Sequence, residues 1–297
     1  MTRSTPAPAL MAVLGIGLLS VMDGMIKYVA AGHATGQVAT LRYVFGALAA
    51  LVVWRAVRTP RPDLAMLRPH AWRGVVVAAT AFCFFYALSV LPLAVVLALS
   101  FTAPIFIALF AVILLREKPG REVHVALVLG FAGVAVVLWD EIGRMPAEGN
   151  YLGLLAALAS AITYALSMIA LKSRAARDPV PTIVLLQNVF AVLLLAPLGV
   201  WHWTPLELPT LGLFAVIGVL GTLGHLCLAW AYGRSDASRL GVLEYTAFVW
   251  AVLIGVVVFA EIPAPMTVAG AALIIGGALI ASRVPKRRHE PDVEIGP

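Results

Sequence analysis

Leu99-Ser100-Phe101-Thr102-Ala103-Pro104 returns 144 residues later as Leu243-Glu244-Tyr245-Thr246-Ala247-Phe248. The same shift relates three further pairs: Glu117 and Glu261, Gly133 and Gly277, and Cys83 and Cys227. Near Arg42-Tyr43 the shift becomes 145 and lands on Gln187-Asn188, which one loop insertion explains. Self-similarity at a fixed separation indicates internal repeats. We therefore predict two structural repeats, residues 1–145 and 146–297.

The composition requires lipid as the solvent for much of this chain. Hydrophobic residues make up 62% and charged residues 12%, whereas a soluble domain carries about 25% charged residues. A net charge of +6 would raise the question of nucleic acid in a soluble protein. Here the basic residues lie in short breaks between apolar runs, a pattern of membrane topology. We predict an integral membrane protein, surrounded by the lipid bilayer and without a nucleic-acid partner.

Ten apolar runs approach the length of roughly 20 residues that a helix needs to cross the hydrocarbon core. They are residues 9–31, 38–57, 72–91, 93–115, 123–139, 152–171, 181–201, 210–231, 237–260 and 265–283. Five helices in a repeat force the second repeat to enter the membrane from the opposite side. The predicted fold is all-α, with ten transmembrane helices in two inverted five-helix repeats, a plan common in transporters.

The basic residues indicate the sidedness of these helices. Nearly all of the 21 Lys and Arg residues fall in segments that share one side of the membrane. One such segment carries Arg55, Arg58, Arg61, Arg68 and Arg73. Segments of the other side carry only Arg144. Because cytoplasmic loops are enriched in Lys and Arg, we predict that both termini are cytoplasmic.

Ionisable groups inside a span cost about 2.5–3.5 kcal/mol on insertion scales, so each is a functional candidate. Asp23 and Lys27 are four residues apart and share a helix face. They form either a local ion pair, with Lys27 reaching toward the interface, or part of a gate or substrate site. Arg42 either ties its helix to Asp23 or binds a substrate carboxylate.

Glu244 is the sharpest of these candidates. It lies eight residues into its predicted span, which is roughly 12 Å deep at 1.5 Å per residue. Its repeat counterpart is Ser100, so the acid is not a shared scaffold feature. Glu244 either binds a substrate ammonium group or a coupling proton, or is a protonated acid bonded to a backbone carbonyl.

His225 follows three glycines spaced three apart, Gly218, Gly221 and Gly224, which allow another helix to approach closely. This histidine is either a satisfied core group or a proton relay. Pro104 removes a backbone bond and frees the carbonyl of Ser100, which predicts either a hinge or a fixed kink.

Aromatic side chains are expected to line a cavity, where they suit flat or cationic substrates through stacking and cation–π contacts. The candidates are Phe82, Tyr86, Tyr164, Trp230 and Tyr245, of which Phe82 and Tyr86 share one helix face with Phe85. The alternative is ordinary packing in the membrane core and, for Trp230, a place in an interfacial aromatic belt.

Three segments resemble the EamA-type domains of the drug/metabolite transporter superfamily. They are Leu41-Arg42-Tyr43-Val44-Phe45, the run from Ala98 to Pro104 followed by Arg116-Glu117-Lys118-Pro119, and Ala260-Glu261-Ile262-Pro263. The second repeat departs from the pattern at Gln187 and Phe248. The resemblance covers nearly the whole chain. It implies a secondary transporter that exports small metabolites, amino acids including aromatic ones, across the bacterial inner membrane by alternating access.

Other functions lack a motif in this sequence. It has no Gly-rich phosphate loop ending in Lys-Ser or Lys-Thr, no His-Glu-x-x-His and no Cys or His cluster. We therefore expect neither an enzyme nor a cofactor nor a metal. The alternative within transport is a facilitative channel or uniporter for other small metabolites or cationic drugs. Coupling to protons is a hypothesis that rests on Glu244, Asp23 and His225.

Overall fold

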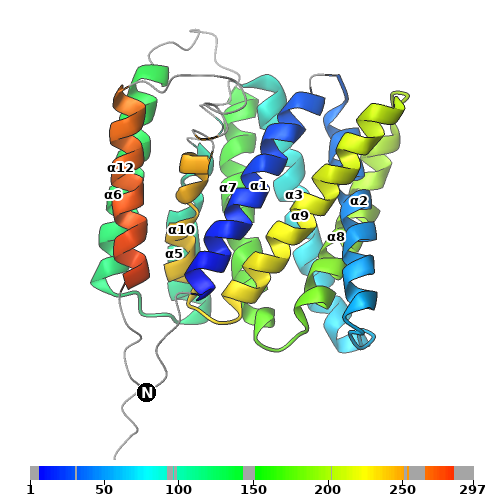
Figure 1. The fold of residues 1–297 in the computed structure, drawn as a ribbon, viewed down its shortest axis with the longest axis horizontal. Helices are drawn as coiled ribbons and strands as arrows, with labels where there is room; N and C mark the ends of the chain where they lie inside the picture. The colour runs from blue at the N-terminus through cyan, green and yellow to red at the C-terminus, as the bar shows by residue number, and fades with distance from the viewer. Residues whose placement is uncertain are drawn as a thin grey trace, which may run out of the picture.

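The computed structural model describes residues 7–30, 32–91, 96, 99–142, 151–201, 203–250, 253 and 265–283, which are helical with short connections and contain no strand. The helices of the first half are α1 (Ala7–Ala30), α2 (Thr35–Ala56), α3 (Leu64–Val90), α5 (Ala103–Leu115) and α6 (Arg121–Ile142). Those of the second half are α7 (Tyr151–Ala175), α8 (Val180–Trp201), α9 (Leu208–Tyr232), α10 (Ala237–Leu243) and α12 (Pro265–Arg283). Figure 1 shows them as a bundle of roughly parallel and antiparallel rods.

Six helices are long and apolar enough to cross a membrane: α1, α2, α3, α7, α8 and α9. Their bounds agree with the predicted spans to within a few residues, except at the start of α3. Each of the four other predicted spans includes residues, or side chains, outside the described part. The count of ten spans and the sidedness therefore stay predictions, and Arg144 and Glu261 lie outside the described residues.

The two halves interleave in the bundle. The second helices of the halves pack on each other (α2 on α8), as do the fourth (α5 on α10) and the fifth (α6 on α12). The first helix of each half packs on the third helix of the other, which pairs α1 with α9 and α3 with α7. The interface between the halves thus joins helices of equivalent position at the second, fourth and fifth places. At the first and third places the positions are exchanged.

Close helix contacts depend on the glycines of α9, as predicted. A Cβ atom at Gly218 would lie 2.6 Å from the backbone nitrogen of Gly46 on α2. One at Gly224 would lie 3.0 Å from the carbonyl oxygen of Gly15 on α1. Any larger residue would force these helices apart, because neither obstacle is a flexible side chain.

The start of α3 differs from the prediction. The helix begins at Leu64, after Asp63 caps it by accepting a 2.8 Å hydrogen bond from the Met66 nitrogen. Arg68 and Arg73 therefore belong to the helix, and their assignment to a connecting segment is wrong. Arg68 is exposed, whereas Arg73 is only 1% exposed. The prediction failed because it began the helix at the apolar run, whereas a polar cap begins it two turns earlier.

Both copies of the repeated segment interrupt a helix. In the first copy Phe101 and Thr102 form a turn before α5, and in the second Glu244 and Tyr245 form a turn after α10. Backbone bonds there span three residues instead of four, as from the Tyr245 nitrogen to the Val242 oxygen at 3.3 Å. One unbroken helix over 237–260 is therefore a wrong prediction. In the first copy the interruption coincides with Pro104, which lies in the first turn of α5.

Threonines at equivalent positions support both interruptions. The Thr102 hydroxyl donates to the Leu99 carbonyl at 2.6 Å, and the Thr246 hydroxyl donates to the Leu243 carbonyl at 2.6 Å. A side chain that bonds a nearby carbonyl offers the backbone an alternative to the helical ladder. The repeat therefore preserves a backbone feature through its Thr, even though the second copy has Phe248 in place of proline.

Candidate functional site

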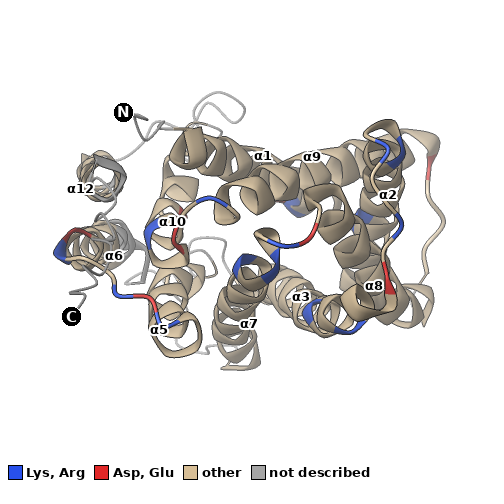
Figure 2. Cartoon of the chain, turned by 90° about the horizontal axis from the view of Figure 1, so that it is seen from below, with Lys and Arg blue, Asp and Glu red and all other residues tan. Residues whose placement is uncertain are grey.

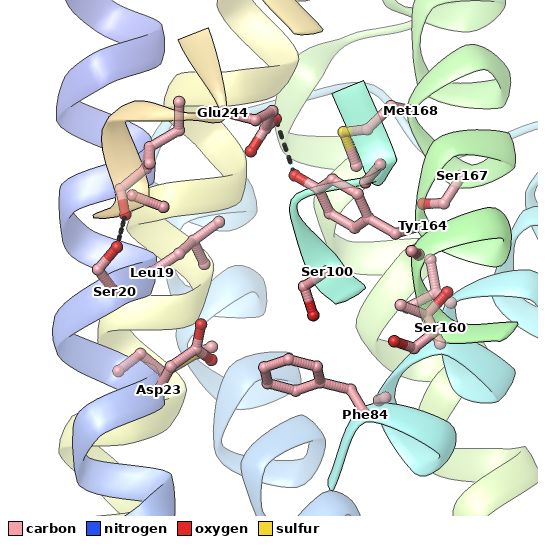
Figure 3. Close-up of a pocket in the computed structure, with 18 of the residues that line it drawn as sticks. Leu19, Ser20, Asp23, Phe84, Ser100, Ser160, Tyr164, Ser167, Met168 and Glu244 are labelled. Carbon is pink, nitrogen blue, oxygen red and sulfur yellow. Dashed lines mark hydrogen bonds between the residues drawn. The ribbon is translucent and has the colours of Figure 1, made fainter. Parts of the chain in front are cut away.

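A cavity of about 210 Å³ lies between the halves, where the two interruptions meet (Figure 3). Its walls come from α1, α2, α3, α7 and α9 and from the two repeated segments. Seven of the predicted site residues line it: Asp23, Arg42, Ser100, Pro104, Tyr164, His225 and Glu244. These residues are scattered along the chain, so the fold brings them together.

Glu244 projects into the cavity from the turn that follows α10 (Figure 3). The Tyr164 hydroxyl of α7 donates to its Oε1 at 2.8 Å. The bonded partner is thus a phenol and not a backbone carbonyl. A carboxyl group held at one oxygen by a neutral donor keeps its other oxygen for a ligand.

Asp23 enters the same cavity from α1, in the opposite half of the chain (Figure 3). Lys27 is exposed, and the local Asp23–Lys27 ion pair is not formed in the described part of the chain. The cavity therefore receives an acid from each half.

Arg42 lines the cavity and is 2% exposed. Its Nη1 donates to Asn188 Oδ1 on α8 at 3.2 Å, and its guanidinium lies 3.9 Å from the centre of the Tyr43 ring. His225 Nδ1 is 2.7 Å from the Gly221 carbonyl oxygen. Because a carbonyl only accepts, Nδ1 carries the proton of that bond, and the neutral ring keeps Nε2 as an acceptor.

The predicted aromatic lining is only partly present. Tyr164 lines the cavity, and Tyr43, Phe84, Phe85 and Phe101 contribute the other aromatic rings. The remaining candidates do not belong to the cavity wall: Phe82, Tyr86, Trp230 and Tyr245. Trp230 instead holds Arg234 4.1 Å from its ring centre, and Tyr245 packs on Phe101 with ring centres 6.2 Å apart.

The α3 stripe that faces the cavity contains Val77, Thr80, Ala81 and Phe84. This is one helical face, with spacings of three and four residues. Its mixture of small, hydroxyl and aromatic side chains was the sequence feature that could have identified the face of α3 toward the cavity. The prediction instead followed the adjacent face with Phe82, Phe85 and Tyr86, which holds more aromatic residues and of which only Phe85 lines the cavity.

The family model described as the EamA-like transporter family matches residues 7–139 and 151–283, and so occurs twice in the chain. The chain belongs to the EamA-like transporter family. This transporter is therefore not an enzyme, and it is a multi-pass integral membrane protein.

Curated relatives of this EamA-like transporter are bacterial transporters. The pseudopaline exporter of Pseudomonas aeruginosa is 29% identical over 281 residues, which cover 93% of this chain and 96% of the relative. The S-adenosylmethionine uptake transporter of Rickettsia prowazekii is 25% identical and covers 90% of this chain and 89% of its own length. The bacterial inner membrane is consistent with these relatives.

A crystal structure of another protein shares the fold of this transporter. It superposes with a TM-score of 0.79 over 93% of this chain and 98% of that chain, at 24% sequence identity. The helical architecture described above is therefore one that an experimental structure contains.

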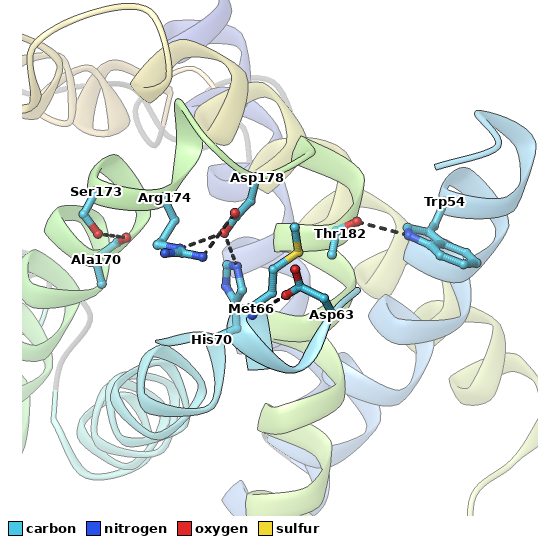
Figure 4. A network of polar contacts seen from close by, with 9 residues as sticks. All are labelled: Trp54, Asp63, Met66, His70, Ala170, Ser173, Arg174, Asp178 and Thr182. Atoms are coloured by element: carbon cyan, nitrogen blue, oxygen red, sulfur yellow. Dashed lines mark hydrogen bonds and ion pairs between the residues drawn. The ribbon is translucent and has the colours of Figure 1, made fainter. Parts of the chain in front are cut away.

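The predictions missed a charged cluster that joins the halves of the transporter (Figure 4). His70 Nε2 of α3 lies 3.0 Å from Asp178 Oδ2, in the connection between α7 and α8, and Arg174 Nε donates to the same oxygen at 2.7 Å. Both His70 and Asp178 are buried. Their separation by 108 residues left no local signal for the pair.

Glu117 makes another polar contact between the halves. Its carboxylate accepts hydrogen bonds from the Ala237 and Ser238 nitrogens at 2.8 and 3.0 Å, and from the Ser238 hydroxyl at 2.7 Å. These donors form the first turn of α10, so Glu117 caps that helix from the other half.

Figure 2 shows the bundle from below, relative to Figure 1. Seen from that side, Lys and Arg residues lie at helix ends and in the connections between helices.

Metal binding has no support in the described part of the chain. There, no three His, Cys, Asp or Glu side chains are placed to hold one ion.

Proposed function

We propose that this transporter is a secondary carrier that exports amino acids, including aromatic ones, from the bacterial cytoplasm by alternating access. The observation that carries the proposal is the cavity between the halves, which receives Asp23 from one half and Glu244 from the other. Acids of opposite halves, deep in an apolar protein, suit a substrate with an ammonium group.

The chemistry of the lining matches an amino acid group by group. Charge-assisted hydrogen bonds from an ammonium group to Glu244 replace the hydration that the substrate loses. Arg42 supplies a cation for the carboxylate. Phe84 and Phe85 offer ring surface for an aromatic or apolar side chain.

The names of the relatives support a substrate that contains an amino acid moiety. S-adenosylmethionine has an amino and a carboxylate group at its methionine end. One relative is named an exporter and the other an uptake transporter. Export is proposed here because the exporter has the higher sequence identity.

Alternating access is supported by the exchanged packing of the halves. Repeats related by a two-fold axis in the membrane plane would place the first helix of each half on the third helix of the other. Two similar halves have outward-open and inward-open arrangements of similar energy. Five spans in each half, with cytoplasmic termini, complete this proposal.

Proton coupling is proposed for the carboxyl groups of the cavity. The titratable groups that face the cavity are Asp23 on α1, Arg42 and Tyr43 on α2, Tyr164 on α7 and His225 on α9, besides Glu244 itself. A carboxyl group that releases its proton when an ammonium group binds exchanges one cation for another.

Counterflow in proteoliposomes tests the function. Purified transporter is reconstituted, loaded with unlabelled amino acids, and offered labelled phenylalanine, methionine or leucine with and without a pH gradient. We expect saturable uptake that unlabelled internal substrate stimulates. Uptake that does not saturate and is not stimulated would instead indicate a channel. Saturable uptake that ignores the pH gradient would indicate a uniporter.

A further inference from the structure

Arg73 is a buried cation whose partners in the described structure are all neutral. It lies on α3, roughly 13 Å beyond the start of that helix, and is 1% exposed. Its Nη2 donates to Gln187 Oε1 at 2.6 Å, and its Nε donates to the Ser167 carbonyl at 3.4 Å. Its Nη1 is buried without a hydrogen-bond partner. Buried guanidinium groups are normally paired with an acid or fully hydrogen-bonded.

Gln187 adds a second unpaired donor at the same place. It is 1% exposed, and its Nε2 is buried without a partner. Since its Oε1 accepts from Arg73, the orientation of the amide is determined and Nε2 remains a donor. Two adjacent side chains therefore each present an unused N–H group, and only an acceptor would satisfy them.

Arg42 brings another cation to the next residue of α8. Arg42 donates to Asn188, while Arg73 donates to Gln187. No ion pair within 4.0 Å joins either guanidinium to an acid of the described residues. Two cations near the same turn repel each other in a low-dielectric interior. An anion between them would relieve that repulsion.

Arg73 and Gln187 do not themselves line the cavity, but Arg73 contacts a residue that does. Ser167, whose carbonyl binds Arg73, lines the cavity, as does Arg42. Gln187 is also the repeat counterpart of Arg42. The second half has a neutral amide where the first half has a cation, and α3 of the first half supplies the missing cation through Arg73.

We propose that Arg73 and Gln187 form, together with Arg42, an anion subsite for the carboxylate group of the transported molecule. The subsite rests on the proposed function and extends it, because it requires a substrate that carries a carboxylate. The ammonium end then lies toward Glu244 and Asp23. A guanidinium and an amide N–H offer two donors to the two oxygens of one carboxylate.

Ligand-dependent thermal unfolding of the purified full-length transporter tests the subsite. The probes are phenylacetate, which carries only the carboxylate, and phenethylammonium, which carries only the amine, with sodium chloride at matched concentration. The variants are Arg73→Gln and Gln187→Leu. Arg68→Gln is the matched control, because it removes the same charge from an exposed position of the same helix.

We expect phenylacetate to raise the unfolding midpoint of the unmodified protein, and chloride to raise it less. The apparent affinity for phenylacetate should fall at least about tenfold in both variants, which is the loss of one charge-assisted interaction. It should change less than about twofold in Arg68→Gln, and the response to phenethylammonium should change as little in every variant. If Arg73→Gln does not fold, Gln187→Leu decides, because it keeps the charge.

Three outcomes would overturn the subsite: no shift with phenylacetate, an equal shift with chloride, or full affinity in both variants. Phenylalanine counterflow separates this result from the proposed function. Arg73-dependent binding of phenylacetate without amino acid counterflow would support the subsite and refute amino acid export. Counterflow that Arg73→Gln and Gln187→Leu leave unchanged would support export and refute the subsite.

Discussion

The two helix interruptions of this transporter share a backbone and differ in chemistry. Each has a threonine that bonds the carbonyl three residues before it, at 2.6 Å in both copies. At one equivalent position that lines the cavity, the first copy has Ser100 and the second has Glu244. Repetition has thus maintained the break in the helix, while the carboxyl group belongs to one half.

The interruptions also differ in what stabilises them. The first has Pro104, which has no N–H for the helical ladder. The second has no proline and follows α10, whose first turn Glu117 caps from the other half. Both breaks therefore share a local threonine bond, whereas the first adds a local proline and the helix before the second is held by a tertiary contact.

The largest effect is expected from removing the charge at the second interruption. Glu244→Gln should lower amino acid counterflow by about 10–100-fold, since a hydrogen bond to a charged group contributes about 1.5–3 kcal/mol. Gln still accepts from the Tyr164 hydroxyl, so the packing is retained. Unmodified protein should lose substrate affinity as pH falls, because a protonated carboxyl does not attract an ammonium group. Glu244→Gln should not show that loss.

Ser100→Ala is the matched change at the first interruption. Its hydroxyl already donates to the Val96 carbonyl at 2.8 Å, so a change of less than about threefold is expected. Equal losses in the two variants would contradict the view that one interruption carries the chemistry.

The second expected effect concerns the cap of α10. Glu117→Ala removes an acceptor of three hydrogen bonds, so a loss of about 2 kcal/mol in stability is expected. Thermal unfolding measures it, and counterflow should fall too because Glu244 directly follows α10. Glu207→Ala is the control, since Glu207 precedes α9 without a side-chain cap bond and is exposed. A similar loss in both variants would mean that Glu117 does not position the second interruption.

The contrast between local and tertiary causes explains what the sequence could predict. The apolar run of α8 was placed at 181–201, and the helix is Val180–Trp201, because lipid exposure demands such a run. Glu244 and Asp23 were recognised because a charge in an apolar run stands out. The break at Glu244 was not predicted, because no proline accompanies it and the Glu117 contact that caps α10 spans 120 residues.

The site residues that were missed have a similar explanation. Arg73 lies beside a cluster of loop arginines, and only the three-dimensional structure shows that it is buried against Gln187. Phe84 replaced Phe82 in the cavity because a nearly uniform apolar helix does not encode its own rotation. Contacts between the halves determine that rotation.

A smaller effect is expected from the threonines that both interruptions share. Thr102→Val and Thr246→Val keep the side-chain shape and remove one hydrogen bond each, worth about 1 kcal/mol. Because the two bonds are equivalent, the two variants should lower the unfolding midpoint by similar amounts. If Thr102→Val were harmless and Thr246→Val were not, proline would suffice for the first break. The shared backbone would then have two unrelated origins.

The smallest effect is expected where the two interruptions touch. Phe101 packs on Tyr245 and on Phe248, with ring centres 6.2 and 6.0 Å apart. The Tyr245 hydroxyl is buried without a hydrogen-bond partner, which costs about 1–3 kcal/mol relative to a bonded one. Tyr245→Phe removes that hydroxyl and keeps the ring, so the unfolding midpoint should stay constant or rise and counterflow should not change. A drop in counterflow with an unchanged midpoint would show that the hydroxyl acts during transport, and the second interruption would then carry two functional groups instead of one.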